Sequence, residues 1–358
     1  MSQTLNTSIN IDRLWKRHNE IAEFGQIYKT GVNRQALSNE EMSARHKLVE
    51  WAKKIGLEVS VDEVSNIFFK LVGERADQPS VMTGSHIDSQ PTGGRYDGTL
   101  GVLAGLEVLE FIIENGIKIQ KSIEVVSWMN EEGSRFAPGM MGSGAFSGSR
   151  EISDILKTKD SNGISVSSEI TKMTREFVNE TKIIKCGRAL HSFIELHIEQ
   201  GPILEKEKKI IGIVSGMQGK KTFMVQILGK EDHVGTCPKS LRKDALLATI
   251  NIISELERCI SGFGDAVRFT VGRLSVQPNA PSVVPREVEF SIDLRHPNDA
   301  VLKLIGEEIE RIIQKFSHPC QSIVKALVDD LSVEFPEMIC KVIENQTKQL
   351  GFRYMRLN

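Results

Sequence analysis

The segment Gly84–Gly98, which reads GSHIDSQPTGGRYDG, is the most informative part of this 358-residue chain. It places His86 and two aspartates, Asp88 and Asp97, among four glycines. Imidazole nitrogens and carboxylate oxygens bind Zn²⁺ and similar divalent ions, and glycines let the backbone bend closely around such a site. The segment therefore predicts a metal site, although a His-x-Asp sequence alone is more often part of an ordinary loop.

Further candidate ligands follow other strand-like runs of the sequence. Glu131 and Glu132 come after one apolar, β-branched run, and His197 ends another. The runs that end at candidate ligands are Val81–Thr83, Ile123–Trp128 and Phe193–His197. Open α/β sheets place their sites at the carboxyl ends of strands, so we expect these groups to meet at one sheet edge.

Each of these residues also has a simpler interpretation. Asp88 could orient an imidazole without binding metal. The second carboxylate of the loop, that of Asp97, could instead bridge two metal ions. Glu131 and Glu132 could form a solvated acidic turn, and His197 could be a core histidine with a backbone partner. In metallohydrolases, one carboxylate of such a pair binds metal while its neighbour takes a proton from water.

The composition is that of a globular protein, with 40% hydrophobic and 26% charged residues. The 45 basic and 47 acidic residues give a net charge of −2, which offers no excess of positive charge for nucleic acid or anionic membranes. We see no secretory signal and no apolar run of the roughly 20 residues that span a bilayer. Five scattered cysteines favour free thiols and a cytoplasmic location.

The first part of the chain alternates helix-like and strand-like segments. Ser38 and Glu41 form a predicted capping box that opens an amphipathic helix, which Gly56 closes. A second helix is predicted over Gly101–Ile113, and strands are predicted over Leu57–Val61, Ile67–Leu71 and the three runs described above. The length suits two domains of ordinary size.

The pattern changes near residue 212. Alternating strands are predicted over Thr222–Leu228, Ala266–Val276 and Glu287–Leu294, with helices over Ser240–Leu256 and Ala300–Phe316. We interpret residues 1–211 as a first domain, 212–330 as an inserted α+β domain, and 331–358 as a return to the first domain through a helix over Pro336–Leu350.

Five segments match a known pattern: Gly84–Gly98, Asn130–Gly148, Glu195–Glu205, His233–Ala245 and Val283–His296. Together they resemble the M20 metallopeptidase clan, specifically its amidase (hydantoinase/carbamoylase) branch. That branch contains N-carbamoyl-L-amino-acid hydrolases, yeast-type β-ureidopropionase and allantoate amidohydrolases. The resemblance implies an α/β fold, in which a mixed-sheet metallohydrolase domain carries an inserted α+β lid and dimerisation domain.

The resemblance also implies a ligand set for two divalent metal ions per subunit. His86, Asp97 and His197 would surround one ion, and Asp97 would bridge to a second ion held by Glu132. Zinc is expected, with manganese, cobalt or nickel as alternatives.

The remaining roles in this domain are implied in the same way. Glu131 would be the general base for a metal-bound hydroxide, and Asp88 would support the site from behind the ligands. The family also has a cis peptide after the bridging aspartate, here Asp97–Gly98.

Residues of the inserted domain, together with Gln200 of the first domain, would complete the site. His233 matches a histidine that reaches the partner subunit's active site, where it could stabilise an oxyanion. Arg295 matches the arginine that clamps the substrate carboxylate, and Gln200 matches a polar residue of the same pocket. The family's substrate-binding asparagine is Ser282 here, and Asn279 stands close by. Without the resemblance, Arg295 could equally be a surface charge at the end of a strand, and His233 could be an ordinary turn residue.

In the family, the segment that matches Leu350–Leu357 is followed by a Gly-rich block with a His-Asp pair, and its histidine completes the second metal site, whereas this sequence ends at Asn358. The expected second site is therefore incomplete. This feature leaves open a non-enzyme alternative, in which the chain is an inactive fragment that lacks the last metal-binding histidine.

The predicted function is that of a cytoplasmic, homodimeric, metal-dependent amidohydrolase. It would cleave a linear amide or ureido C–N bond in a small carboxylate-bearing molecule, first an N-carbamoyl-L-amino acid. Allantoate or another ureido acid is the second choice of substrate, and a peptide is the third. No nucleic acid and no membrane are expected as partners.

Overall fold

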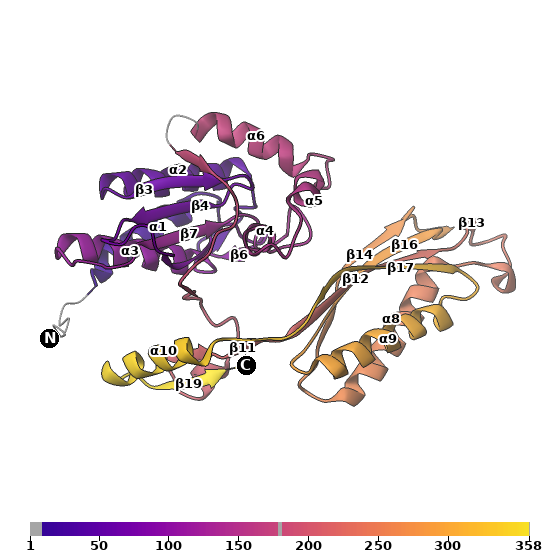
Figure 1. Cartoon of the computed structure of the whole chain (residues 1–358). Helices are drawn as coiled ribbons and strands as arrows, with labels where there is room; N and C mark the ends of the chain where they lie inside the picture. Colours follow the sequence, from indigo (N-terminus) through magenta and orange to yellow (C-terminus); the bar gives the residue numbers. More distant parts are fainter. Residues whose placement is uncertain (1–8, 178–180, 358) are drawn as a thin grey trace. The chain divides into compact units, whose positions relative to one another are not determined.

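The computed structural model describes residues 9–177 and 181–357. The chain divides between Ile198 and Glu199 into two compact units, which Figure 1 shows in indigo to magenta and in magenta to yellow. Of the helices in these described ranges, none combines the length and apolarity that crossing a membrane requires.

The first unit is built on a six-stranded mixed sheet with the order β8-β3-β4-β7-β5-β9. Strand β5 is parallel to both β7 and β9, whereas β4 is antiparallel to β3 and β7. The strands are β3 (Glu58–Asp62), β4 (Ile67–Leu71), β5 (Val81–His86), β7 (Ile123–Trp128), β8 (Lys182–Ile184) and β9 (Ser192–Ile194). The predicted mixed sheet is confirmed. A small second sheet contains β1 (Gln26–Ile27), β2 (Gly31–Val32) and β6 (Gly93–Gly94).

Alternating strand residues build the core of this unit on both faces of the sheet. Phe69 and Val125 belong to the main apolar cluster with helices α2 and α3, whereas Phe68 and Val126 belong to a smaller cluster that includes Trp128. This alternation is the period of two that strands impose. The helices are α1 (Ile11–Glu23), α2 (Asn39–Lys54), α3 (Thr99–Glu114), α4 (Met141–Ser147), α5 (Ile152–Lys157) and α6 (Val166–Phe177).

The predicted helix boundaries of this unit are confirmed at α2. The Ser38 side chain accepts a hydrogen bond from the backbone N–H of Glu41, as an N-cap residue does. The Glu41 carboxylate reaches back to the N–H of Leu37, one residue before the cap. Gly56 follows the last turn with φ of 84°, a conformation that glycine adopts without strain.

The second unit contains a four-stranded antiparallel sheet with two helices on one face. The strand order is β14-β16-β12-β17. The elements are β12 (Gly219–Leu228), α8 (Ala245–Ile260), β14 (Arg268–Gln277), β16 (Glu287–His296), α9 (Asp299–Phe316) and β17 (Gln321–Asp330). Val288, Phe290, Ile292 and Leu294 of β16 alternate into the core with both helices, and the residues between them line the other face. The predicted α+β character of this segment is confirmed.

The second unit also contains shorter elements outside this sheet. β10 (Ile211–Val214) pairs in parallel with β19 (Tyr354–Leu357) near the end of the chain. The others are α7 (Ile203–Lys206), β11 (Gly216–Met217), β13 (Asp232–His233), β15 (Val283–Val284), β18 (Val333–Glu334), α10 (Glu337–Gln349) and two 3₁₀ turns, η1 (Lys239–Leu241) and η2 (Ser261–Phe263). The domain boundaries at residues 211 and 330 stay predictions.

Several predicted elements have different bounds in the structure, among them β5, which continues beyond the predicted Val81–Thr83 to His86. The helix predicted to begin at Ser240 begins at Ala245, because residues 239–241 form a 3₁₀ turn and Asp244 caps the helix. The strand predicted to reach His197 ends at Ile194, so this histidine lies in the loop beyond it.

Candidate metal centre

Three neighbouring parallel strands bring the candidate ligands to one edge of the first unit's sheet. His86 is the last residue of β5, and Glu131 and His197 each lie three residues past the ends of β7 and β9. Since β5 lies between β7 and β9 and is parallel to both, all three carboxyl ends open on the same edge. This arrangement confirms the expected meeting of strand ends.

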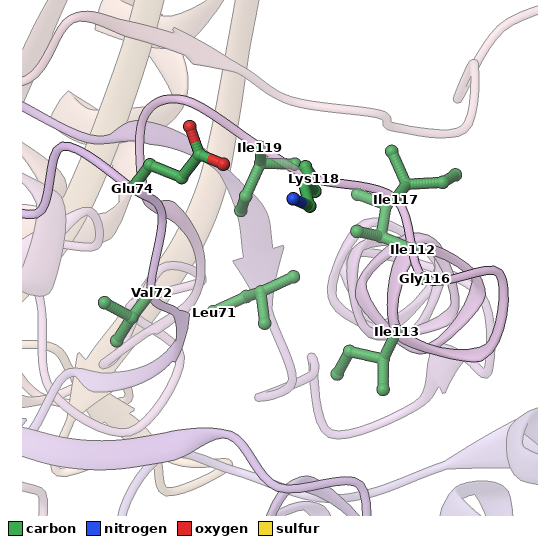
Figure 2. A pocket seen from close by; sticks show the side chains of 9 residues that line it. All are labelled: Leu71, Val72, Glu74, Ile112, Ile113, Gly116, Ile117, Lys118 and Ile119. Carbon is green, nitrogen blue, oxygen red and sulfur yellow. The ribbon is translucent and has the colours of Figure 1, made fainter.

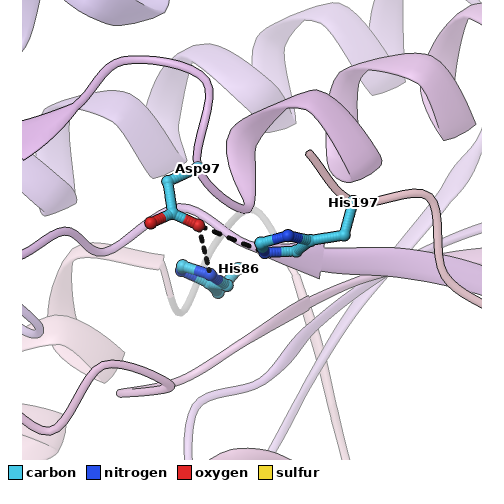
Figure 3. Close-up of side chains that lie close together, drawn as sticks. All are labelled: His86, Asp97 and His197. Atoms are coloured by element: carbon cyan, nitrogen blue, oxygen red, sulfur yellow. Dashed lines mark ion pairs between the residues drawn. The ribbon is translucent and has the colours of Figure 1, made fainter. Parts of the chain in front are cut away.

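His86, Asp97 and His197 form a cluster whose potential ligand atoms lie within 4.8 Å of one another, as Figure 3 shows. Asp97 Oδ1 lies 3.1 Å from His197 Nε2 and 3.8 Å from His86 Nε2. The His86 side chain is buried, and the other two are partly exposed. Two imidazole nitrogens and a carboxylate are a donor set that fits Zn²⁺ and related divalent ions.

Both imidazoles are held in the same tautomer by backbone carbonyl groups. His86 Nδ1 lies 2.9 Å from the carbonyl oxygen of Asp88, and His197 Nδ1 lies 2.9 Å from that of Ile198. A carbonyl oxygen only accepts hydrogen bonds, so each Nδ1 carries the hydrogen and donates it. Each Nε2 therefore faces the Asp97 carboxylate, and the protonated His197 ring donates its Nε2–H to Asp97 Oδ1. When a metal ion displaces the Nε2 protons, the Nε2 lone pairs would bind that ion at the same position.

Electrostatics in the cluster follow from the close packing of these groups. The hydrogen bond to Asp97 raises the pKa of His197, and the same interaction lowers the pKa of Asp97. Burial lowers the pKa of His86, but Asp88 and the charge of Glu131 outweigh burial and raise it to about 10. The carboxylates thus favour positive charge between the rings, as a cation site requires.

Gly98 is required for the close approach of the Asp97 loop to His86. Its φ is 62°, and a Cβ atom there would lie 2.4 Å from the His86 ring. The cis peptide implied after Asp97 is not found: among the described residues, the cis bonds precede Pro138, Pro278 and Pro319. The positive φ of Gly98 turns the chain here, and a cis bond to a residue other than proline costs about 2.5–4 kcal/mol.

Asp88 connects the histidine to the acidic turn after β7. Its Oδ1 accepts the backbone N–H of Glu131 at 3.2 Å, and its Oδ2 accepts that of Glu132 at 3.1 Å. Oδ1 also lies 3.6 Å from His86 Nδ1. The buried Asp88 carboxylate therefore fixes the acidic turn relative to the ligand loop.

Glu131 and Glu132 take different positions. Glu131 Oε2 lies 3.6 Å from His86 Nε2, beside the cluster, and burial raises the pKa of the Glu131 carboxyl. Glu132 Oε2 accepts a hydrogen bond from Gln90 Nε2 at 2.7 Å. Within the described part of the chain, Glu132 does not join the three-residue cluster. Its role as a ligand of a second ion stays a prediction.

Sequence reasoning missed two polar groups here. Gln90 holds the Glu132 carboxylate, as described above. Glu195 accepts a hydrogen bond from the Ser85 hydroxyl, and its charge also raises the pKa of Glu131. The sequence offered one signal for each: Gln90 is four residues after His86, and Glu195 is two residues before His197.

In the second unit, His233 lies on the short strand β13, opposite Val283 of β15. The backbone N–H of Gly235 donates to His233 Nδ1 at 3.1 Å. Nδ1 is therefore an acceptor, and the hydrogen of the neutral ring resides on Nε2. Arg242 closes the same loop by donating to the carbonyl oxygens of Val234 at 2.6 Å and Cys237 at 2.9 Å.

The other predicted substrate residues of this unit are spread along it. The carbonyl oxygen of Ser282 accepts the N–H of Val234, so Ser282 lies beside the His233 loop. Asn279 lies in the loop before β15 with φ of 56°, and Gln200 lies just after the boundary between the units.

Arg295 lies near the opposite end of β16. Its Nε donates to Asp293 Oδ1 at 2.9 Å, and Lys220 Nζ lies 3.2 Å from Asp293 Oδ2. Arg295 lies eight residue steps after Glu287, the first residue of β16, and eight steps correspond to about 26 Å of extended chain. Glu287 closely follows β15, which pairs with the His233 strand β13. The structure therefore does not bring Arg295 and His233 together within one chain.

A surface pocket of about 220 Å³ lies at the other edge of the first unit's sheet. Figure 2 shows its apolar lining from the end of β4, the end of α3 and the loop before β7, with Glu74 and Lys118 as its charged residues. β7 begins beside this pocket and ends beside the ligand cluster, so the pocket is separate from the metal centre.

The fold and the donor set define a metallohydrolase of the mixed α/β class. The chain belongs to peptidase family M20/M25/M40, whose model matches residues 82–345. A crystal structure of an amidase of the hydantoinase/carbamoylase family from Burkholderia vietnamiensis matches with a TM-score of 0.94 and 37% identity. This match covers 99% of this chain and 86% of that chain.

Curated relatives point to the same branch of the family. The N-carbamoyl-L-amino-acid amidohydrolase of Rhizobium meliloti is 33% identical over 98% of this chain and 84% of its own length. The allantoate amidohydrolase of Bacillus subtilis is 33% identical over 87% of this chain and 74% of its own length.

Proposed function

We propose that this protein hydrolyses a linear amide or ureido C–N bond of a small carboxylate-bearing substrate, with an N-carbamoyl-L-amino acid as the first choice. The observation that carries the proposal is the cluster of His86, Asp97 and His197, with both Nε2 atoms directed at the carboxylate. The similarity to an N-carbamoyl-L-amino-acid amidohydrolase supports this choice, and that to an allantoate amidohydrolase supports a ureido acid as the second.

In this proposal the three clustered residues hold one divalent ion, and Asp97 with Glu132 contributes to a second. Zinc suits the donor set best, and manganese, cobalt or nickel are alternatives. When bound, such an ion acts as a Lewis acid, which would polarise the substrate carbonyl and increase the acidity of water.

Glu131 is the proposed general base. Its carboxylate lies beside His86 without belonging to the three-residue cluster, and it extends from a turn whose backbone Asp88 fixes. From this position it would accept a proton from the attacking water and return that proton to the leaving nitrogen.

His233 and Arg295 are the proposed substrate-binding groups of the inserted domain. The Nε2–H of His233 is a donor suited to the negative charge that develops on the carbonyl oxygen. The Arg295 guanidinium offers a planar pair of donors for a substrate carboxylate, and Asp293 already orients it. Gln200, Asn279 and Ser282 would line the same pocket.

The distance between the two ends of β16 supports the proposed homodimer. A small substrate cannot span the roughly 26 Å of strand between Arg295 and the region of His233. If both residues contact one substrate, they come from two chains, so the site is complete only when a second copy contributes a residue. The cytoplasmic location is part of the same proposal, and the five free cysteines support it.

Release of ammonia tests the proposed reaction. We expect the zinc-loaded protein to release ammonia from N-carbamoyl-L-amino acids faster than from their D enantiomers or from allantoate, and to lose this activity after treatment with a chelator. Faster turnover of allantoate would replace the first substrate with the second. Zinc binding without any ammonia release would identify the non-enzyme alternative.

A further inference from the structure

Arg34 is a fully buried arginine that lies between the two loops of the candidate metal centre. Its side chain is 1% exposed. The Nε atom donates to the carbonyl oxygen of Ile87 at 2.8 Å, and Nη2 donates to the Thr99 hydroxyl at 3.2 Å. Ile87 stands between His86 and Asp88, and Thr99 directly follows the Asp97–Gly98 turn. One guanidinium therefore contacts both ligand-bearing segments.

The remaining contacts of Arg34 anchor it to the surrounding structure. Nη1 donates to the carbonyl oxygens of Ile21 at 2.8 Å and Phe24 at 2.9 Å, at the end of helix α1. The Arg34 backbone N–H donates to Ser89 Oγ at 2.9 Å, and its carbonyl oxygen accepts the Ser89 N–H at 2.8 Å. The loop after His86 is thus held by both the backbone and the side chain of residue 34.

The surroundings of Arg34 are unusual for a buried cation. Of the described residues, none places a carboxylate oxygen within 4.0 Å of its guanidinium. By contrast, Arg45, which is equally buried, pairs with Glu41 at 2.8 Å. Burial of an unpaired charge is costly, and the cost is offset here by hydrogen bonds to four oxygen atoms. Apolar packing between the two loops would not require a buried charged side chain at this position.

We propose that Arg34 is a positioning residue that sets the separation between the His86 loop and the Asp97 turn. This inference rests on the proposed metal centre, because it assigns Arg34 a role in that centre's geometry. Its planar guanidinium donates in three directions from fixed positions, whereas a lysine ammonium in the same cavity is a single point with three donors. Arg34→Lys would keep the charge and lose the connection between the loops.

Titration with Co²⁺ alone, followed by visible absorption, tests this role without depending on catalysis. We expect Arg34→Lys to weaken Co²⁺ binding by about tenfold or more, in the range found when groups that orient metal ligands are removed. The matched control is Arg45→Lys, which alters an equally buried arginine that donates to the Ser65 carbonyl oxygen and to Glu41, outside both ligand loops. This control is expected to lower the thermal midpoint and leave Co²⁺ affinity unchanged.

Thr99 provides a milder pair of variants in case Arg34→Lys does not fold. Thr99→Val removes the oxygen that accepts from Arg34 Nη2 and preserves the side-chain shape, whereas Thr99→Ser keeps that oxygen. We expect Thr99→Val to weaken Co²⁺ binding by about threefold to tenfold, the value of one hydrogen bond, and Thr99→Ser to bind as the wild type does.

The outcomes separate this inference from the proposed function. If the wild type binds Co²⁺ and Arg34→Lys or Thr99→Val binds it equally well, Arg34 is a structural residue only and the inference is wrong. If the wild type binds no Co²⁺, the metal centre itself is wrong, and the inference fails with it.

Discussion

The two histidines of the cluster show how much of the site is determined by atoms that a sequence pattern does not contain. The residue types and their places after strands predicted that His86 and His197 would meet. The ring orientation depends on two backbone carbonyl groups, those of Asp88 and Ile198, whose directions follow only from the folded loops. For the same reason, the sequence predicted Asp88 as a supporting residue without revealing that it holds the N–H groups of the acidic turn.

Replacement of Glu131 with glutamine tests the division of roles in the acidic pair. An amide cannot accept a proton as a carboxylate does, so kcat should fall by about 10²–10⁴-fold. Metal content should stay close to that of the wild type, because Glu131 is outside the ligand cluster. Elemental analysis beside the kinetic measurement checks this, and loss of metal from the variant would mean that Glu131 is itself a ligand.

Asp88→Asn should weaken metal binding and stability together. In the wild type, each Asp88 oxygen accepts one backbone N–H. In the variant, the asparagine NH₂ group replaces one of these oxygens, so one backbone N–H has no acceptor. We expect a loss of about 1–3 kcal/mol in the free energy of unfolding and about tenfold or more in Zn²⁺ affinity.

The matched control for Asp88 is Asp62→Asn. Asp62 is also buried, and its Oδ1 accepts the backbone N–H groups of Val64 at 3.1 Å and Asn66 at 2.9 Å in a turn between β3 and β4. The control should lose stability and keep its metal affinity. Equal Zn²⁺ affinities for the two variants would show that Asp88 does not position the centre.

At the scale of elements, hydrophobic pattern and capping residues predicted most strands and helices of both units. β7 and β4 have the predicted bounds, and α3 (Thr99–Glu114) contains the helix predicted over Gly101–Ile113. The errors occur where local structure depends on neighbours. β9 is short because it pairs with β5 over only three residues, and the predicted start of α8 was displaced by a 3₁₀ turn. Contacts between distant segments, such as the parallel pairing of β10 with β19, have no signal in a single sequence.

Helix α1 gives a prediction for pH dependence through His18. This residue is 1% exposed, packs against Trp15 and Tyr96, and has no hydrogen-bond partner for its ring nitrogens among the described residues. Burial and the charge of Arg34 lower its pKa to about 4, below the ordinary value of 6.5. The unfolded chain therefore takes up a proton first as the pH falls, and stability from this group is lost between about pH 6.5 and pH 4.

The size of this effect is up to about 3 kcal/mol, since one pKa unit corresponds to about 1.4 kcal/mol. His18→Phe keeps an aromatic ring in the cavity and removes the titration. Urea midpoints at pH 7.5 and pH 5 should therefore differ less for the variant than for the wild type. An equal loss of stability in both proteins would contradict the low pKa of His18.

At the scale of the whole molecule, the proposed dimer predicts complementation between two inactive variants. Glu131→Gln damages the first unit, and His233→Ala damages the second. If His233 acts on the partner's site, a mixed dimer has one intact site, with Glu131 from one chain and His233 from the other. Random mixing of equal amounts should therefore restore about a quarter of wild-type activity, whereas each variant alone stays inactive. Failure of mixed and refolded samples to exceed the separate variants would place His233 in its own chain's site.

We expect the carboxyl ends of three parallel strands, β5, β7 and β9, to form a metal centre. Anomalous diffraction from crystals grown with Zn²⁺, recorded above and below the zinc absorption edge, tests it most directly. We predict an anomalous peak bounded by the Nε2 atoms of His86 and His197 and the Asp97 carboxylate, at Zn–N distances of about 2.0–2.1 Å. Absence of a peak at that position, or coordination through Nδ1 of either ring, would contradict the account.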